Sequence, residues 1–116
     1  MKAILLSAIF ASLGSVSFAQ SALEAWTADR TQVFDAADIV PEDFVWIARP
    51  IVVFAQSPND PMFIQQLALL TERIDALAER DVIVITDTTP EPASELRKQL
   101  RPRAFMLAII GKDGRT

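Results

Sequence analysis

Cysteine and histidine are both absent from this chain of 116 residues. Their absence excludes a disulfide, a thiol nucleophile, a Cys-Xaa-Xaa-Cys redox pair, a histidine general base, a Ser-His triad and the usual His/Cys zinc site. We therefore expect no cofactor and no metal, and the fold has to be stabilised by its apolar core. Glycine is also scarce, with three residues, and none of them forms a glycine-rich phosphate loop.

Basic side chains are in the minority, with 11 Lys and Arg against 15 Asp and Glu and a net charge of −4. Nucleic acids are bound by basic faces, and basic segments are also what anionic membrane surfaces attract. The sequence therefore predicts neither a nucleic acid nor an anionic membrane as partner. The length allows a single domain.

Residues 1–19 differ in composition from the rest of the chain. Lys2 supplies a positive charge, residues 3–13 form an apolar run with two serines in it, and Ser17 and Ala19 are small residues at cleavage positions. This pattern predicts a signal peptide cleaved after Ala19 and a periplasmic or secreted protein. The apolar run is shorter than the roughly 20 residues that span a bilayer, so we expect no stable membrane anchor after cleavage.

Residues 20–43 are acidic and show no sustained hydrophobic period. The single base Arg30 stands against six acids: Glu24, Asp29, Asp35, Asp38, Glu42 and Asp43. Because chain termini are often poorly ordered, we predict a solvated, partly mobile N-terminal arm in preference to a partner-binding face. The folded domain is then expected over residues 44–116, with Phe44 and Trp46 in an extended lead-in to the core.

The stretch from Ile51 to Asp87 is the strongest fold signal. Residues 51–55 and 82–86 are nearly continuous apolar runs rich in β-branched side chains, which is typical of strands buried on both faces. A helix is predicted between them, with Asn59 or Asp60 as its cap and a proline in its first turn. The three elements predict a right-handed βαβ unit with parallel strands.

One apolar stripe runs along this predicted helix, which should extend to about Arg80. Its members are spaced by four, three, four and three residues, which matches a helical period: Phe63, Leu67, Leu70, Ile74 and Leu77. Ile64, Leu69 and Ala78 are expected to widen the stripe. Each large apolar side chain contributes about 2 kcal/mol when fully buried, so Leu70→Glu should unfold the domain.

A second, shorter helix is expected after the second strand, capped by Thr89. Its basic end, with Arg97 and Lys98, complements the helix dipole and is interpreted as a solvated helix end in preference to an anion site. Residues 104–110 predict a third strand, and Gly-Lys-Asp-Gly at 111–114 a hairpin turn. Two residues follow that turn, so we expect an α/β domain truncated before its last strand and helix, with an exposed edge strand.

The candidate binding residues are Ser57, Asn59, Asp60 and Asp87. They follow the two predicted strands, and ligands of open α/β sheets bind at the carboxyl ends of the strands. Ser57 has no histidine partner and Asp60 would repel an anion, so neither a nucleophile nor a phosphate site is predicted. The carboxylates match no calcium loop and are typical of caps. No catalytic residue is predicted.

The order of predicted elements resembles a thioredoxin-like domain, a three-layer α/β sandwich. Four stretches of the sequence are similar to domain-of-unknown-function family 4174, over about Phe44 to Gly114. They are residues 46–55, Gln65-Gln66-Leu67, residues 78–82 and residues 110–114. This resemblance implies an exported domain distantly related to peroxiredoxins. In thioredoxins the redox cysteines open the first long helix, where this chain has Ser57 to Pro61. Pro102 lies slightly early for the cis-proline of such folds.

Two classes of function follow from these observations. The sequence favours a non-catalytic binding or accessory module that engages a protein partner through the loops 56–62 and 87–92. The alternatives are a divergent enzyme of peroxiredoxin-like ancestry with altered chemistry, or an inactive truncated product. Peroxide consumption or disulfide reduction would distinguish the enzyme from the binding module.

Overall fold

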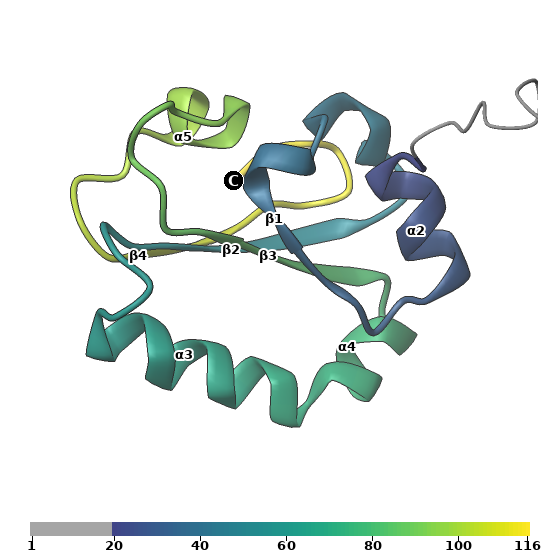
Figure 1. Ribbon diagram of the computed structural model, residues 1–116. Helices are drawn as coiled ribbons and strands as arrows, with labels where there is room; N and C mark the ends of the chain where they lie inside the picture. Colours follow the sequence, from purple (N-terminus) through teal and green to yellow (C-terminus); the bar gives the residue numbers. More distant parts are fainter. Residues whose placement is uncertain (1–19) are drawn as a thin grey trace, which may run out of the picture.

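The computed structural model describes residues 20–116, so the predicted signal peptide lies outside the described residues. The described chain is a mixed α/β fold around an open four-stranded sheet in the order β1-β3-β2-β4 (Figure 1). Its elements in chain order are α2 (Ala22–Ala28), β1 (Val33–Asp35), two 3-10 turns η3 (Ala36–Asp38) and η4 (Pro41–Phe44), β2 (Arg49–Phe54), α3 (Pro61–Glu72), α4 (Ile74–Glu79), β3 (Val82–Asp87), α5 (Glu95–Leu100) and β4 (Met106–Ile109).

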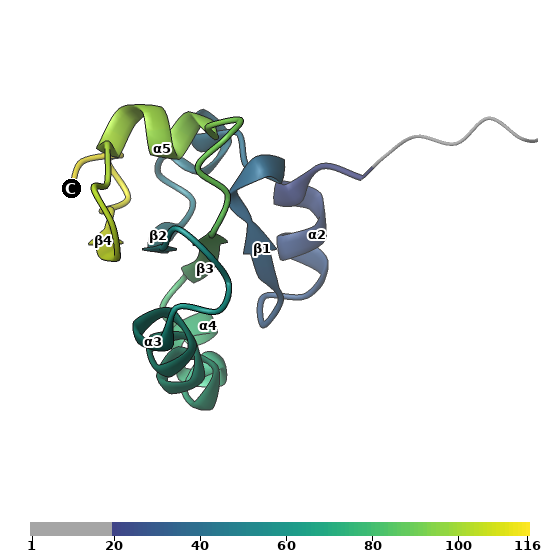
Figure 2. The ribbon, with the colours of Figure 1, turned by 60° about the vertical axis from the view of Figure 1, so that its left-hand side comes forward.

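The two central strands are the predicted ones. β2 and β3 run parallel, with Ile51 opposite Val84 and Phe54 opposite Asp87. Their side chains are almost all buried, because helices cover both faces of the sheet: α3 and α4 lie on one face, and α2 and α5 lie on the other (Figures 1 and 2). The prediction of a parallel βαβ unit is confirmed.

The crossover between these strands is two helices rather than the single predicted helix. α3 ends at Glu72, and Arg73 leaves helical geometry at φ −112° and ψ 19°. The hydroxyl of Thr71 donates to the Ala68 carbonyl at 3.1 Å, and such back-bonding competes with the helical ladder and bends helices. Of the predicted stripe, Phe63 is buried and the others are partly buried, whereas Ile64 and Leu69 face solvent, contrary to prediction.

The acidic segment before residue 44 folds onto the domain and contributes apolar side chains to the core, so the prediction of a separate solvated arm was wrong. Ser21 and Glu24 form a capping box that starts α2, and that helix buries Trp26 completely. β1 then pairs in parallel with β3, and Phe34 and Ile39 join the same cluster. The segment shows no sustained hydrophobic period because its buried side chains come one at a time from a short helix, a three-residue strand and 3-10 turns.

The core is unequal on the two faces of the sheet. The larger cluster lies on the α2 and α5 face and includes Trp26 and Phe44, whose rings meet edge to face with centroids 6.3 Å apart. The smaller cluster, on the α3 face, has three buried members: Val53, Ala55 and Phe63. The α2 and α5 face therefore contributes most of the apolar burial.

The carboxyl-terminal part follows the predicted order with different boundaries. α5 is capped by Ser94, not by Thr89, because the Ser94 hydroxyl accepts from the Arg97 N–H at 3.0 Å. β4 is shorter than predicted and runs antiparallel to β2. Gly114, at φ 85°, closes the turn that follows. Trp46, expected in the core lead-in, is instead 72% exposed.

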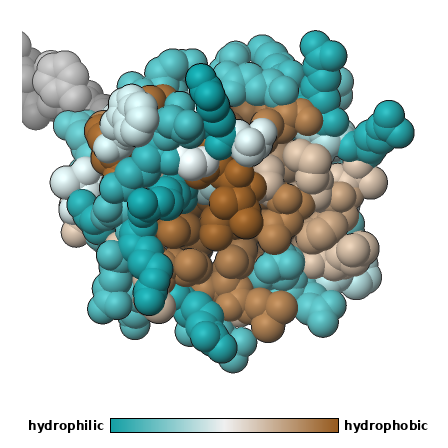
Figure 3. Space-filling model, turned by 180° about the vertical axis from the view of Figure 1, so that it is seen from behind, coloured by the Kyte–Doolittle hydropathy of each residue, from teal (hydrophilic) through white to brown (hydrophobic). Residues whose placement is uncertain are grey.

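The outer edge of β4 is unpaired within the part of the chain that the structure describes. Leu107 and Ile109 are 38% and 62% exposed. Both lie on the α3 face, since they are register partners of Val53 and Ile51. Figure 3, which views the molecule from the β4 side, shows apolar side chains gathered at the centre of this surface. Whether a further strand belongs here stays a prediction.

Candidate functional site

The carboxyl ends of β2 and β3 lie side by side, as the sequence predicted. The Ala55 N–H donates to the Asp87 carbonyl at 2.9 Å, so the loop after β2 and the loop after β3 leave the sheet together. This arrangement brings the four predicted binding residues to one edge of the sheet, although they differ in their surroundings.

Three of the four are on the loop between β2 and α3. The Ser57 hydroxyl accepts from the Asn59 N–H at 3.1 Å, and Asp60 Oδ1 accepts from the Met62 N–H at 2.9 Å. Ser57 therefore orders the turn and Asp60 caps α3, which confirms the predicted cap. Asn59 on this loop and Met62 in the first turn of α3 are exposed, so both are available to a partner.

Asp87 is buried and fully engaged. Its Oδ1 accepts from Nε and Nη2 of Arg97 at 3.1 and 2.9 Å and from the Thr89 N–H at 3.2 Å, and its Oδ2 accepts from the Ser94 hydroxyl at 2.6 Å. The side chain is 3% exposed. A ligand could reach this carboxylate only by displacing one of these donors, so Asp87 acts on the site by holding the loop that follows it.

Arg97 was misread from the sequence as part of a solvated helix end. Its side chain is 8% exposed, lies over the ring of Phe54 at 5.5 Å, and its Nη2 donates to the carbonyls of Ala55 and Asp87 at 2.9 and 3.1 Å. One guanidinium thus joins the ends of β2, β3 and α5. The one available signal was the acid that ends a buried strand, since a buried carboxylate requires a charged or hydrogen-bonded partner.

The chemical content of this edge is limited. No group of three or more acidic, cysteine or histidine side chains that could hold a metal occurs within residues 20–116. The loop between β3 and α5 contains a cis peptide bond, between Glu91 and Pro92 and not at Pro102.

None of the helices within residues 20–116 is both long and apolar enough to cross a bilayer.

A second acidic centre lies at the opposite end of β3. Asp81 accepts from Arg30 Nη1 at 2.5 Å and from Lys112 Nζ at 2.7 Å. The hydrogen bond from Lys112, followed by that from Arg30, holds the pKa of Asp81 below its usual range. These contacts attach the α2–β1 connection and the carboxyl-terminal turn to the start of β3, so this centre is structural.

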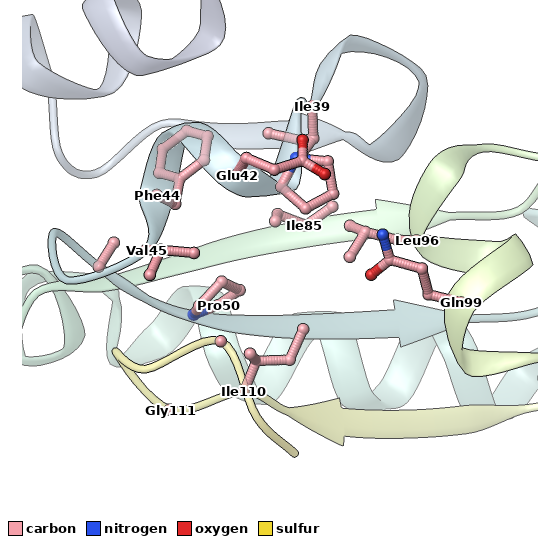
Figure 4. A pocket seen from close by; sticks show the side chains of 13 residues that line it. Ile39, Glu42, Phe44, Val45, Pro50, Ile85, Leu96, Gln99, Ile110 and Gly111 are labelled. Atoms are coloured by element: carbon pink, nitrogen blue, oxygen red, sulfur yellow. The ribbon is translucent and has the colours of Figure 1, made fainter.

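An apolar pocket, which the sequence did not predict, lies on the α5 face of the sheet between η4 and α5 (Figure 4). Its cavity has a volume of about 140 Å³. Phe44, Ile85 and Leu96 form buried walls, and the polar side chains at its rim are Glu42 from η4 and Gln99 from α5. Its walls come from four separate elements, which is why no local sequence pattern indicated it.

In a comparison with known proteins, the model of the family described as "Domain of unknown function (DUF4174)" matches residues 40–116, from the residue before η4 to Thr116. No curated protein and no solved structure matches the chain.

Proposed function

The chain belongs to the DUF4174 family, and from that premise we propose that it is a non-catalytic binding or accessory module on a thioredoxin-like scaffold. The proposed location is the periplasm or the cell exterior, supported by the signal-like pattern of residues 1–19. The parallel β1-β3-β2 core, the antiparallel β4 and the helices on both faces support the thioredoxin-like arrangement.

The proposal rests on the sheet edge at the carboxyl ends of the strands, where open α/β domains bind their ligands. The candidate polar side chains at this edge are already engaged in hydrogen bonds within the protein. The one buried carboxylate there, Asp87, is neutralised by Arg97 and bonded to Ser94. Ser57 is occupied in its own turn and has no general base to activate it. The edge therefore presents a rigid shape without a reactive group.

The proposed contact surface is the exposed part of the β2–α3 loop together with the first turn of α3. Asn59 on the loop is exposed and Met62 in the helix is 57% exposed, and Met is enriched where proteins meet. The Asp87–Arg97 pair holds this loop from beneath through the Ala55 carbonyl. A preformed loop binds at a lower entropic cost than one that has to be ordered.

Two measurements test this function. The purified chain should neither consume peroxide nor reduce a disulfide above a Leu70→Glu control, and turnover above that control would refute the non-catalytic assignment. In a pull-down from the secreted or periplasmic fraction, wild type should retain a protein that the double variant Asn59→Arg/Met62→Glu does not retain. Gln65→Glu, on the exposed side of α3, is the matched control and should behave as wild type. Equal retention by all three would exclude this loop as the contact.

A further inference from the structure

The outer edge of β4 presents backbone groups that have no strand beside them within residues 20–116. The Ile110 N–H donates to the Pro50 carbonyl at 2.8 Å, and alternate residues of an antiparallel pair bond to the neighbouring strand. Ala108, two residues before Ile110, therefore also bonds to β2. The N–H and C=O groups of Leu107 and Ile109 point the other way, away from the sheet.

This edge lacks the features that usually protect the edge of a sheet. Proteins make edge strands short or place charged residues or proline in them. β1, at the opposite edge, has three residues and ends in Asp35. β4 has neither charge nor proline, and its exposed side chains, Leu107 and Ile109, share one face. Free backbone groups beside apolar side chains at alternate positions are recognised by an extended polypeptide segment of matching pattern.

The charge around β4 is opposite in sign to that of the rest of the described chain. Residues 101–115 carry four basic side chains and one acidic side chain. Residues 20–100 carry six basic and fourteen acidic side chains. Such an asymmetry indicates the charge of a partner, so an acidic segment is favoured at this edge.

Two of these arginines lie at opposite ends of β4. The Arg103 carbonyl accepts from Gln56 Nε2 at 2.9 Å, which fixes the backbone just before the strand. The Arg115 carbonyl accepts from the Gly111 N–H at 2.8 Å, so Arg115 follows the strand on its outer side. Both side chains are exposed, and within residues 20–116 neither forms a salt bridge. Each can pair with a carboxylate on a neighbouring strand.

We propose that β4 binds an extended segment of a partner protein as a further antiparallel strand. The segment has apolar side chains at alternate positions, which pack on Leu107 and Ile109, and acidic residues at both ends, which face Arg103 and Arg115. A second copy of this chain is the weaker occupant, because antiparallel pairing of two β4 strands brings the Arg103 end of one copy beside the Arg115 end of the other. This surface is additional to the β2–α3 loop, so either can fail without the other.

The test is a titration of the ¹⁵N-labelled chain with peptides, followed by ¹H–¹⁵N correlation spectra and amide hydrogen exchange. The first peptide is acetyl-Glu-Glu-Val-Thr-Val-Thr-Val-Glu-Glu-amide, and the second has lysine at the four glutamate positions. We expect the lysine peptide to bind about tenfold more weakly, since exposed ion pairs contribute modestly. The amides of Leu107 and Ile109 should become protected from exchange, while that of Ala108, already bonded to β2, should not change.

Methylated peptides test the backbone hydrogen bonds on the unaltered chain. In the proposed pairing the valine N–H groups point at β4 and the threonine N–H groups point to solvent. N-methylation of the valines should abolish binding, whereas N-methylation of the threonines should preserve it. No binding of the acidic peptide, equal binding of the lysine peptide, or equal binding of both methylated peptides would overturn the proposal. A dimer of the chain that excludes the acidic peptide would assign the edge to a second copy and would also overturn it.

Three kinds of variant identify the groups responsible. Ile109→Pro removes an outward N–H at an edge position where proline is tolerated, so binding should be lost while the spectrum stays that of a folded chain. Arg103→Gln and Arg115→Gln should each weaken the acidic peptide by about fivefold or less. Lys98→Gln removes an exposed cation from α5 and is the matched control, which should bind as wild type. A loss in Lys98→Gln equal to that in both arginine variants would show that net charge alone attracts the peptide.

Discussion

Replacing Arg97 by methionine should be among the most destabilising substitutions in this domain. The guanidinium is the charged partner of the buried Asp87 carboxylate and donates to the Ala55 carbonyl. Removing one member of a buried ion pair costs about 3–5 kcal/mol, because the other charge stays buried without compensation. Against a typical total of about 5–15 kcal/mol for a domain, Arg97→Met should leave a marginal fold.

The structure also indicates which part of this cost can be recovered. In Arg97→Met the Asp87 carboxylate keeps two donors, the Ser94 hydroxyl and the Thr89 N–H, while the Ala55 carbonyl loses its guanidinium donor. Adding Asp87→Asn removes the buried charge and leaves an amide oxygen that can accept the hydrogen bond from Thr89 or Ser94. The double variant should therefore be more stable than Arg97→Met by about 2 kcal/mol, since replacing both members of a buried pair is often neutral.

Urea titration followed by far-UV circular dichroism measures these free energies by linear extrapolation. The signal comes from the backbone, so the exposed Trp46 does not interfere. Wild type, both single variants and the double variant complete a double-mutant cycle. A loss below about 1 kcal/mol in Arg97→Met, or a double variant no more stable than that single variant, would refute the reasoning from a buried pair.

Three further predictions concern positions outside this buried pair. The folded-state pKa of Asp81 is lowered, so its ion pairs stabilise the fold at pH values above its unfolded pKa of about 4. The difference in unfolding free energy between wild type and Asp81→Asn should therefore close as pH falls through the lowered folded-state pKa. A difference that stays constant when unfolding is measured across this pH range would contradict the prediction. Ile109→Lys should reduce concentration-dependent association in sedimentation velocity, because a charge blocks pairing at a sheet edge; Ile64→Lys, similarly exposed but on a helix, should not. Trp46→Gly should leave thermal stability unchanged or raise it by up to about 1 kcal/mol, because Trp46 has a left-handed φ of 67° that costs an L-residue energy; clear destabilisation would show that its exposed ring makes a stabilising contact.

The central strands were predictable because both of their faces lie in the same apolar environment. Val52, Ile83 and Ile85 are in continuous apolar runs, and both faces of the sheet are covered, so almost every position in these runs is buried. The Asp60 cap was predictable for the same reason, since it depends on the adjacent backbone alone. Features that a few neighbouring residues determine can be inferred from sequence.

The rest depended on contacts between distant segments. Trp26 is the only fully buried side chain of a seven-residue helix, and its environment comes from Phe44 and the sheet. Arg97 follows Leu96 in a six-residue helix, and both residues are buried. The helix-dipole argument favours the opposite, a solvated basic end. The pocket likewise depends on the spacing of η4 and α5 above the sheet, and no sequence period encodes that distance.

The position of β1 in the sheet has a consequence for the order in which the chain folds. β1 is made before β2, yet within residues 20–116 its one strand partner is β3. Val33 can therefore pair only after Val84 has been synthesised. Contacts between residues far apart in sequence carry a high loop-closure entropy and slow folding. As the chain emerges from the ribosome, the amino-terminal members of the larger core, Trp26 and Phe34 among them, have no sheet to pack on until β3 has followed. During that interval these aromatic side chains are the ones that a chaperone would find exposed.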